Sequence, residues 1–162
     1  MTWMRLNNAP INDINEQLLI DISEYNVNRS GVSPRGLSFF IGGDSQMRCN
    51  AVKYCVVLVM SSNGRGARGY YTTIVKKGRV SRQQRLFKET YYAVKYALRF
   101  NPLLESIGYK ISEIHTDLNP DSQYPSSDMI ASCIGYIRGM GFVGKCKPES
   151  WASYGVADIK TK

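Results

Sequence analysis

The chain has 162 residues, 43% of them hydrophobic and 21% charged, and its 21 basic and 13 acidic residues give a net charge of +8. This length corresponds to about one domain, and the composition excludes a disordered, collagen-like or low-complexity chain. The basic excess favours a polyanionic partner such as nucleic acid, with a merely solvated basic surface as the alternative.

The basic residues are unevenly distributed along the chain. Residues 65–88 contain eight of them and no acidic residue, whereas residues 1–35 carry a net charge of −1. A positive field is therefore concentrated in the middle of the chain, which is the pattern expected of a surface that contacts nucleic acid.

The sequence shows no membrane span and no pattern for a metal–thiolate site. The longest uninterrupted apolar run, Cys55 to Met60, is far shorter than the ~18 residues that a bilayer requires. No secretory signal follows Met1, so we expect a cytoplasmic protein without a membrane partner. The four cysteines form no Cys-x-x-Cys pair and His115 is the only histidine, so free thiols are expected instead of a zinc site.

The first 36 residues are expected to form a helical extension followed by a loop. Apolar residues recur at helical spacing between Ile11 and Tyr25, and residues 26–36 are rich in Asn, Ser, Gly and Pro. We therefore divide the chain into this extension, residues 1–36, and a main domain, residues 37–162.

The main domain begins with three strands that are expected to form an antiparallel meander. Leu37–Ile41 is a short apolar run closed by two glycines, and Ala51–Met60 is a longer run typical of a strand buried on both faces. The Asn63-Gly64 pair predicts a tight hairpin turn before the third strand, Tyr70–Lys77.

Helices and strands then alternate along the chain. Ser81 can cap a long central helix, which is expected to stop at Asn101-Pro102. The remaining elements are a strand at Lys110–Thr116, a helix from Pro125 to about Gly139, a strand at Phe142–Cys146 and a closing helix from Ser150 to about Asp158. The order βββαβαβα predicts an α/β fold with a mixed five-stranded sheet, three antiparallel strands and then two parallel ones, flanked by helices.

Four carboxylates occupy positions close to the expected core. Asp44 and Asp117 each end an apolar strand. Glu89 lies beside the core-facing stripe of the central helix, and Asp158 lies in the closing helix. The alternatives are an ordinary helical ion pair between Glu89 and Arg85, and an ordinary terminal carboxylate for Asp158. If the four meet, their repulsion requires a cation, and oxygen ligands favour a pair of Mg²⁺ or Mn²⁺ ions.

Five short motifs follow one another in order along the main domain. They are Gly43 to Gln46, Arg85 to Thr90, Ile114 to Asn119, Lys147 to Ser150 and Val156 to Lys162. Over about residues 38–162 the chain resembles the YkuK-like family of predicted ribonuclease H-like nucleases, although Gly43 stands where a Thr is expected in the family motif. The resemblance implies a ribonuclease H-like fold and metal-dependent phosphodiester hydrolysis. It also implies that the catalytic and metal-binding residues are Asp44, Glu89, Asp117 and Asp158.

Several polar residues near these acids are candidates for binding a substrate. The candidates for water or 2′-hydroxyl contacts are Ser45, Gln46 and Asn119. The candidates for phosphate contacts are Arg82, Arg85, Lys145 and Lys147. Loop capping is the alternative for the first set, and Lys147 alternatively neutralises the acids. His115 precedes Asp117 by two residues along a strand, where a structural hydrogen-bonding residue and a proton shuttle are both possible, and it is left out of the catalytic set.

These features together predict a two-metal nuclease that acts on RNA, DNA or an RNA/DNA hybrid. A catalytically silent nucleic-acid binding module is the alternative, and a protein-interaction domain is a third possibility. The sequence indicates no particular oligomeric state.

Overall fold

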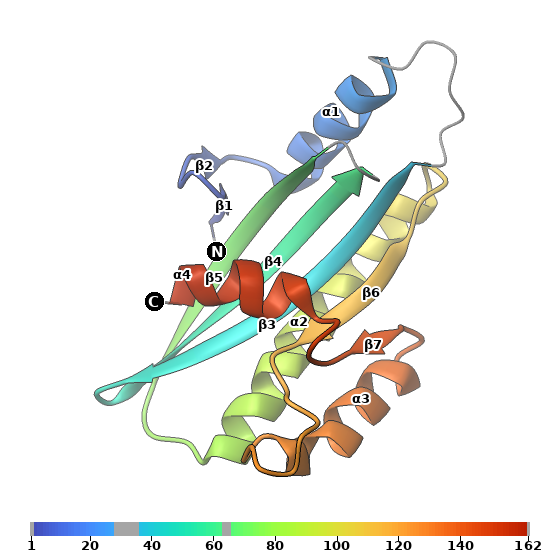
Figure 1. The fold of residues 1–162 in the computed structure, drawn as a ribbon. Coiled ribbons are helices and arrows are strands. Elements are labelled where there is room, and N and C mark those ends of the chain that lie inside the picture. The colour runs from blue at the N-terminus through green and yellow to red at the C-terminus, as the bar shows by residue number, and fades with distance from the viewer. Residues whose placement is uncertain (1, 28–35, 63–65, 162) are drawn as a thin grey trace.

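A computed structural model describes residues 2–27, 36–62 and 66–161 of the chain (Figure 1). Its strands are β1 (Trp3–Arg5), β2 (Pro10–Ile11), β3 (Leu37–Arg48), β4 (Ala51–Ser62), β5 (Ala67–Lys77), β6 (Ile111–Thr116) and β7 (Gly144–Lys145). Its helices are α1 (Ile14–Val27), α2 (Arg82–Glu105), the short 3₁₀ turn η1 (Ser127–Met129), α3 (Ile130–Gly139), the π-helical segment η2 (Ala152–Ala157) and α4 (Asp158–Thr161).

The strands form one mixed sheet in the order β2-β1-β5-β4-β3-β6-β7. β3, β4 and β5 make the antiparallel meander expected from the sequence, and β6 and β7 continue the sheet in parallel from β3. The predicted number of five strands is wrong, because β1 and β2 add two strands at the edge of β5. These strands have only three and two residues, too few for an alternating pattern to be recognised.

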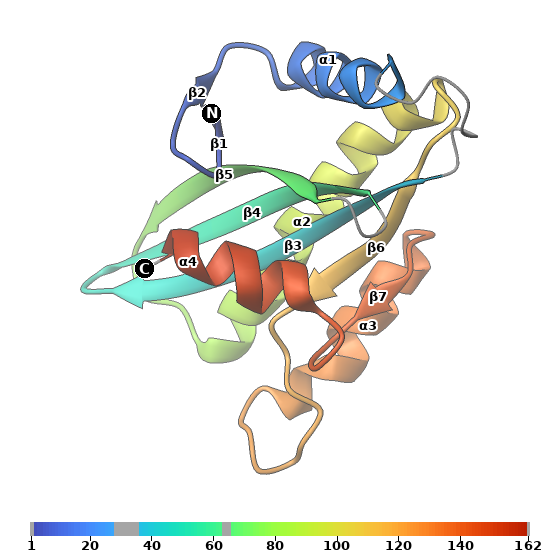
Figure 2. The same cartoon turned by 45° about the horizontal axis from the view of Figure 1, so that its top comes forward.

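Helices cover both faces of the sheet (Figures 1 and 2). α2 packs on one face with α3 beside it, and the closing segment of η2 and α4 crosses the other face over β3 and β4. Alternate side chains of the strands supply the two cores: Ile41 belongs to the α2 side, whereas Val57 packs with Ala152 and Ala157 of η2. Within the described ranges, no helix is both long enough and apolar enough to span a membrane.

Several element boundaries differ from those predicted. β3 continues past its two glycines to Arg48, because its ladder with β4 extends to the Arg48–Ala51 pair. α2 passes through Pro102 and ends at Glu105, so this proline, which removes one helical hydrogen bond, lies in the last turn of the helix. The closing helix starts as a π-helix and ends at Thr161, and α3 is preceded by a 3₁₀ turn. Ser81 caps α2 as predicted, through a reciprocal pair of hydrogen bonds with Gln84.

Part of the predicted loop structure lies outside the described residues. This applies to the Asn63-Gly64 turn and to residues 28–35 of the loop expected at 26–36. Beside that turn, the backbone N–H and the hydroxyl of Ser62 both donate to the carbonyl of Gly66, each at 3.0 Å. The first helix extends to Val27, two residues further than predicted, and Ile11 belongs to β2 instead of the helix.

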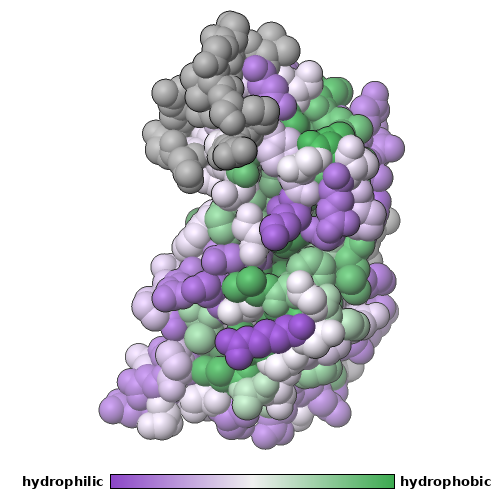
Figure 3. Space-filling model, turned by 90° about the vertical axis from the view of Figure 1, so that its right-hand side faces the viewer, coloured by the Kyte–Doolittle hydropathy of each residue, from purple (hydrophilic) through white to green (hydrophobic). Residues whose placement is uncertain are grey.

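The strand β7 forms one edge of the sheet and has only two residues. The nearby side chains of Met140 and Val143 are 41% and 54% exposed. Figure 3 views the molecule from this side and shows hydrophobic residues interspersed with hydrophilic ones. So short an edge strand offers little backbone for pairing with another chain.

The N-terminal extension packs into the main core. Trp3 contacts Tyr96 and Phe100 of α2 edge-to-face, with ring centroids 5.2 and 5.3 Å apart. Leu18 and Ile22 of α1 are buried in the same cluster. The extension therefore shares its apolar core with the main domain.

A buried carboxylate, Asp21, attaches α1 to the sheet. It is 1% exposed and accepts hydrogen bonds from Gln17 at 3.1 Å, from Arg68 at 2.6 Å and from the Tyr70 hydroxyl. Arg5 Nη2 lies 3.4 Å from the same carboxylate. Burial and the Asp21 carboxylate both raise the pKa of Tyr70, so this phenol stays protonated and donates to Asp21.

Tyr70→Phe is expected to destabilise the protein by about 1–3 kcal/mol, because it removes a buried donor from the Asp21 carboxylate. The measurement is urea-induced unfolding of both proteins at neutral pH. Tyr109→Phe is the matched control, since the hydroxyl of Tyr109 meets Asn26 at the exposed surface, 3.3 Å away. Equal stabilities of the two variants would show that the Asp21 network does not stabilise the fold.

Candidate active site

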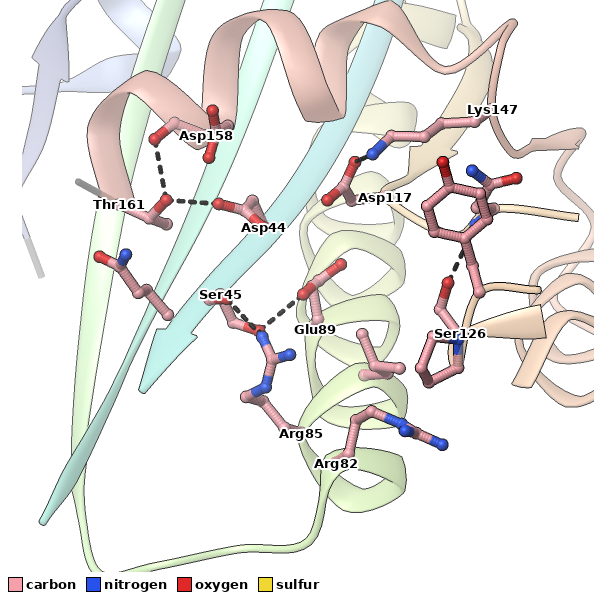
Figure 4. Close-up of a pocket in the computed structure, with 15 residues that line it drawn as sticks. Asp44, Ser45, Arg82, Arg85, Glu89, Asp117, Ser126, Lys147, Asp158 and Thr161 are labelled. Carbon is pink, nitrogen blue, oxygen red and sulfur yellow. Dashed lines mark hydrogen bonds and ion pairs between the residues drawn. The ribbon is translucent and has the colours of Figure 1, made fainter. Parts of the chain in front are cut away.

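Asp44 lies in the middle of β3, on the sheet face that the closing segment covers (Figure 4). The residue is 7% exposed, and Thr161 Oγ1 of α4 donates a hydrogen bond to Asp44 Oδ2. Burial raises the pKa of Asp44, and the charges of Asp117 and Asp158 act in the same direction, whereas the bond from Thr161 opposes them. Asp44 is therefore a nearly buried carboxyl group with two other acids close enough to affect it.

Two glycines before Asp44 allow the chain to approach β3 closely from both sides. A methyl group on Gly42 would lie 2.6 Å from the carbonyl carbon and oxygen of Ala152 in η2. A methyl group on Gly43 would lie 3.2 Å from the backbone oxygen of Glu89 in α2. The glycines therefore bring the two acid-bearing helical segments against the strand that carries Asp44.

Gly42→Ala is expected to displace η2 and to destabilise the protein by about 1–3 kcal/mol, because the new methyl group meets backbone atoms that cannot rotate away. Thermal unfolding measures the effect. Gly135→Ala is the matched control, because open space surrounds Gly135 in α3 and alanine there is expected to stabilise the helix by up to about 1 kcal/mol. Gly42→Ala with unchanged stability would refute the close approach of η2.

Glu89 extends from α2 and approaches β3 on the sheet face opposite to the closing segment. It is 3% exposed, and Ser45 Oγ donates to Glu89 Oε2 at 2.6 Å. Arg85 Nη1 donates to Ser45 Oγ at 2.9 Å and also to the Ser45 carbonyl, so Arg85 reaches Glu89 through Ser45 in place of a direct helical ion pair. Burial and the charge of Asp44 raise the pKa of Glu89 well above its ordinary value, and the bond from Ser45 opposes this rise.

Asp117 enters the site from the end of β6. Thr116, the last residue of β6, pairs with Gly43 on the parallel strand β3, so the next residue emerges beside Asp44. Asp117 Oδ1 lies 2.7 Å from Lys147 Nζ, as Figure 4 shows. This buried oxygen accepts no hydrogen bond of good geometry from the described residues, so the contact with Lys147 is an ion pair.

His115 positions the segment that carries Asp158. The ring is fully buried in β6, its Nδ1 accepts the Ala152 N–H at 3.1 Å, and its Nε2 lies 3.1 Å from Glu113 Oε2. This pattern assigns the proton to Nε2, and burial lowers the pKa of His115 against the opposing effect of Glu113. Asp158 begins α4 directly after the π-helical turn. Of the two roles considered for His115, these contacts favour the structural one.

The acids and most of the predicted binding residues line a single cleft of about 420 Å³. The predicted residues that line it are Asp44, Ser45, Gln46, Arg82, Arg85, Glu89, Asp117, Asn119, Lys147 and Asp158. Lys145 is not among the lining residues. It lies on β7 and pairs with Glu149 at 2.5 Å. Arg82 Nη2 lies at the rim, 3.4 Å from Asp128 Oδ2.

Sequence reasoning missed five lining residues of the cleft. They are Leu86, Tyr124, Pro125, Ser126 and Thr161. Thr161 contacts Asp44 directly and donates to the carbonyl of Asp158 at 2.9 Å. Its position three residues after Asp158 in a helix was the available signal, because residues at that spacing lie on one face. Ser126 accepts the Asn119 N–H at 3.1 Å and shapes the loop after β6.

The donor set of the cleft fits a hard divalent cation, since it consists of carboxylate and hydroxyl oxygens. Among the described residues, however, no three acidic, histidine or cysteine side chains already form a cluster that could hold a metal ion. Asp117 is paired with Lys147, Asp44 with Thr161, and Glu89 with Ser45. Binding of a cation would therefore require these side chains to exchange partners.

The chain was compared with known proteins by sequence and by structure. No curated protein matches the sequence. Among solved structures, the chain is similar to LC11-RNase H1 in complex with an RNA/DNA hybrid, at 11% identity and a TM-score of 0.40, over 75% of this chain and 95% of that one. The family model described as Ribonuclease H-like matches residues 19–162, which confirms the family predicted from the motifs and extends it into α1. The chain belongs to the ribonuclease H-like family.

Proposed function

We propose that this protein is a metal-dependent nuclease that hydrolyses phosphodiester bonds of RNA, DNA or an RNA/DNA hybrid. The observation that carries the proposal is the gathering of four acids around one cleft that also contains Arg82, Arg85 and Lys147. Acids that can hold metal ions and basic side chains that can hold a phosphate are both components of a metal-dependent phosphodiesterase site. Membership of the ribonuclease H-like family supports the same activity.

Asp44, Glu89, Asp117 and Asp158 would hold two Mg²⁺ or Mn²⁺ ions. When bound, such a pair of ions activates a water molecule and stabilises the leaving oxygen of the phosphodiester. The raised pKa values of Asp44 and Glu89 have burial and neighbouring acids as their causes, so added positive charge would favour the ionised carboxylates.

The other lining residues orient the acids and the substrate. Ser45 holds Glu89 through a hydrogen bond, and Arg85 holds Ser45. Arg82, at the rim of the cleft, would contact a substrate phosphate without reading the base sequence. Lys147 would leave Asp117 for a substrate phosphate once a cation occupies the site.

Binding without catalysis is the second candidate function. The observation that favours it is the ion pair of 2.7 Å between Lys147 and Asp117, because the lysine ammonium group can neutralise Asp117 without a metal ion. A binding module of this kind would show salt-sensitive affinity for nucleic acid and no metal-dependent turnover.

One assay tests both candidates. End-labelled single-stranded RNA, single-stranded DNA, an RNA/DNA hybrid and both duplexes are incubated with the protein in Mn²⁺, Mg²⁺ or EDTA. The nuclease proposal expects products with Mn²⁺ or Mg²⁺ and none with EDTA. Binding to these substrates without any product would support the binding module instead.

A further inference from the structure

The closing segment formed by η2 and α4 covers only part of its face of the sheet. Along β3, residues 44, 46 and 48 point to the same face, because side chains alternate along a strand. The ladders place Gln46 opposite Lys53, and Lys53 opposite Val75. The next row on this face joins Arg48, Ala51 and Lys77. We call these two rows the open sheet face.

The closing segment covers the neighbouring rows and stops short of the open sheet face. Cys55, the partner of Asp44, is 1% exposed beneath η2, and Val57 is fully buried. By contrast, Val75 is 64% exposed, and Arg48 and Lys77 are also exposed. In Figures 1 and 2 the end of the β3–β4 hairpin extends beyond the helix formed by η2 and α4.

The open sheet face is basic and joins the cleft. It carries Arg48, Lys53 and Lys77 from three adjacent strands, and none of its six residues is acidic. Gln46 lines the cleft itself and accepts a hydrogen bond from Arg48 Nε at 3.0 Å. The open sheet face therefore adjoins the cleft at Gln46.

The open sheet face combines basic side chains with the exposed apolar side chain of Val75. An exposed valine surrounded by basic side chains suits a ligand that has both phosphate and sugar surfaces. Basic side chains on adjacent strands can contact successive phosphates of a polyanionic chain, because residues paired across the strands lie on the same face of the sheet.

We propose that the sugar–phosphate backbone of a nucleic acid crosses the open sheet face on its way to the cleft. Arg48, Lys53 and Lys77 contact its phosphates, and Val75 contacts a sugar. The inference rests on the proposed function, since it names the surface that guides the same substrate. It assigns the basic groups of β3, β4 and β5 a role separate from those of Arg82 and Arg85.

The test compares binding by three proteins, all carrying Asp44→Asn so that the probe stays intact. The first has no further change, and the second adds Arg48→Gln, Lys53→Gln and Lys77→Gln. The third adds Lys95→Gln, Lys110→Gln and Arg138→Gln, which remove the same charge from exposed positions away from the open sheet face. The probes are a fluorescein-labelled single-stranded DNA and an RNA/DNA hybrid, titrated over a series of salt concentrations.

The open-face variant is expected to lower the slope of log affinity against log salt for the single strand by about 2, because three phosphate contacts are lost. The third protein is expected to keep the slope of the first. Equal slopes for the second and third proteins would overturn the inference and leave the proposed function standing. Absence of salt-dependent binding by the first protein to either probe would overturn both. Thermal unfolding of each variant verifies that it is folded.

Discussion

Replacing Asp44 by Asn is expected to remove metal-dependent cleavage while the protein remains folded. The asparagine oxygen can still accept the hydrogen bond from Thr161, so the closing segment keeps its contact with β3. The loss in kcat/KM should exceed about 100-fold, because even the outer partners of a metal ligand are worth 10–100-fold. The measurement is the initial rate of product formation with saturating Mn²⁺.

Lys145→Gln is the matched control. Lys145 is close in sequence to Lys147, which lines the cleft, but Lys145 pairs with Glu149 and does not line the cleft. This variant is expected to keep close to wild-type activity. An identically purified preparation from cells without the protein measures contaminating nuclease. Wild-type turnover by Asp44→Asn above that background would contradict the assignment of Asp44.

Glu89→Gln is expected to stabilise the metal-free protein at neutral pH and to remove its stabilisation by Mg²⁺. The pKa of Glu89 in the folded protein is raised above its ordinary value of 4.5, so the folded state favours the protonated form. The contribution of Glu89 to metal-free stability is therefore greatest below about pH 4.5 and falls as the pH rises from there towards the raised pKa. Asp44, whose pKa is raised from 3.8, contributes in the same direction.

Thermal unfolding in EDTA between pH 4 and 8 measures this dependence. Above pH 7, Glu89→Gln is expected to unfold at least about 2 °C higher than the wild type, the shift that about 1 kcal/mol produces in a domain of this size. Glu105→Gln is the control, because Glu105 lies exposed at the end of the same helix. A Glu89→Gln protein that is less stable in EDTA and still stabilised by Mg²⁺ would contradict the role of Glu89.

The central elements of the fold could be predicted from local patterns. The meander of β3, β4 and β5 and the cap of α2 at Ser81 each depend on signals that lie within a few residues. The acids could be predicted because a carboxylate beside an apolar strand or a core-facing helix stripe conflicts with its surroundings. Four such conflicts pointed to the residues that line the cleft.

The remaining features depend on contacts between distant segments. β1 forms because Met4 pairs with Tyr71 of β5, and three residues are too few to show a sequence pattern that predicts this pairing. Thr161 contacts Asp44 from 117 residues away, through a π-helical turn that local periodicity does not indicate. From the sequence, Lys147 could either contact a phosphate or neutralise the acids. Its ion pair with Asp117 depends on the tertiary structure, which brings the two residues together.

Metal binding tests the central claim most directly, because it needs no choice of substrate. Free Mn²⁺ is measured by electron paramagnetic resonance during titration of the wild type, Asp44→Asn and Lys145→Gln. We expect two ions bound by the wild type and by Lys145→Gln, and fewer or weaker ions in Asp44→Asn. No saturable binding by the wild type, or equal binding by Asp44→Asn, would contradict a two-metal site in this cleft.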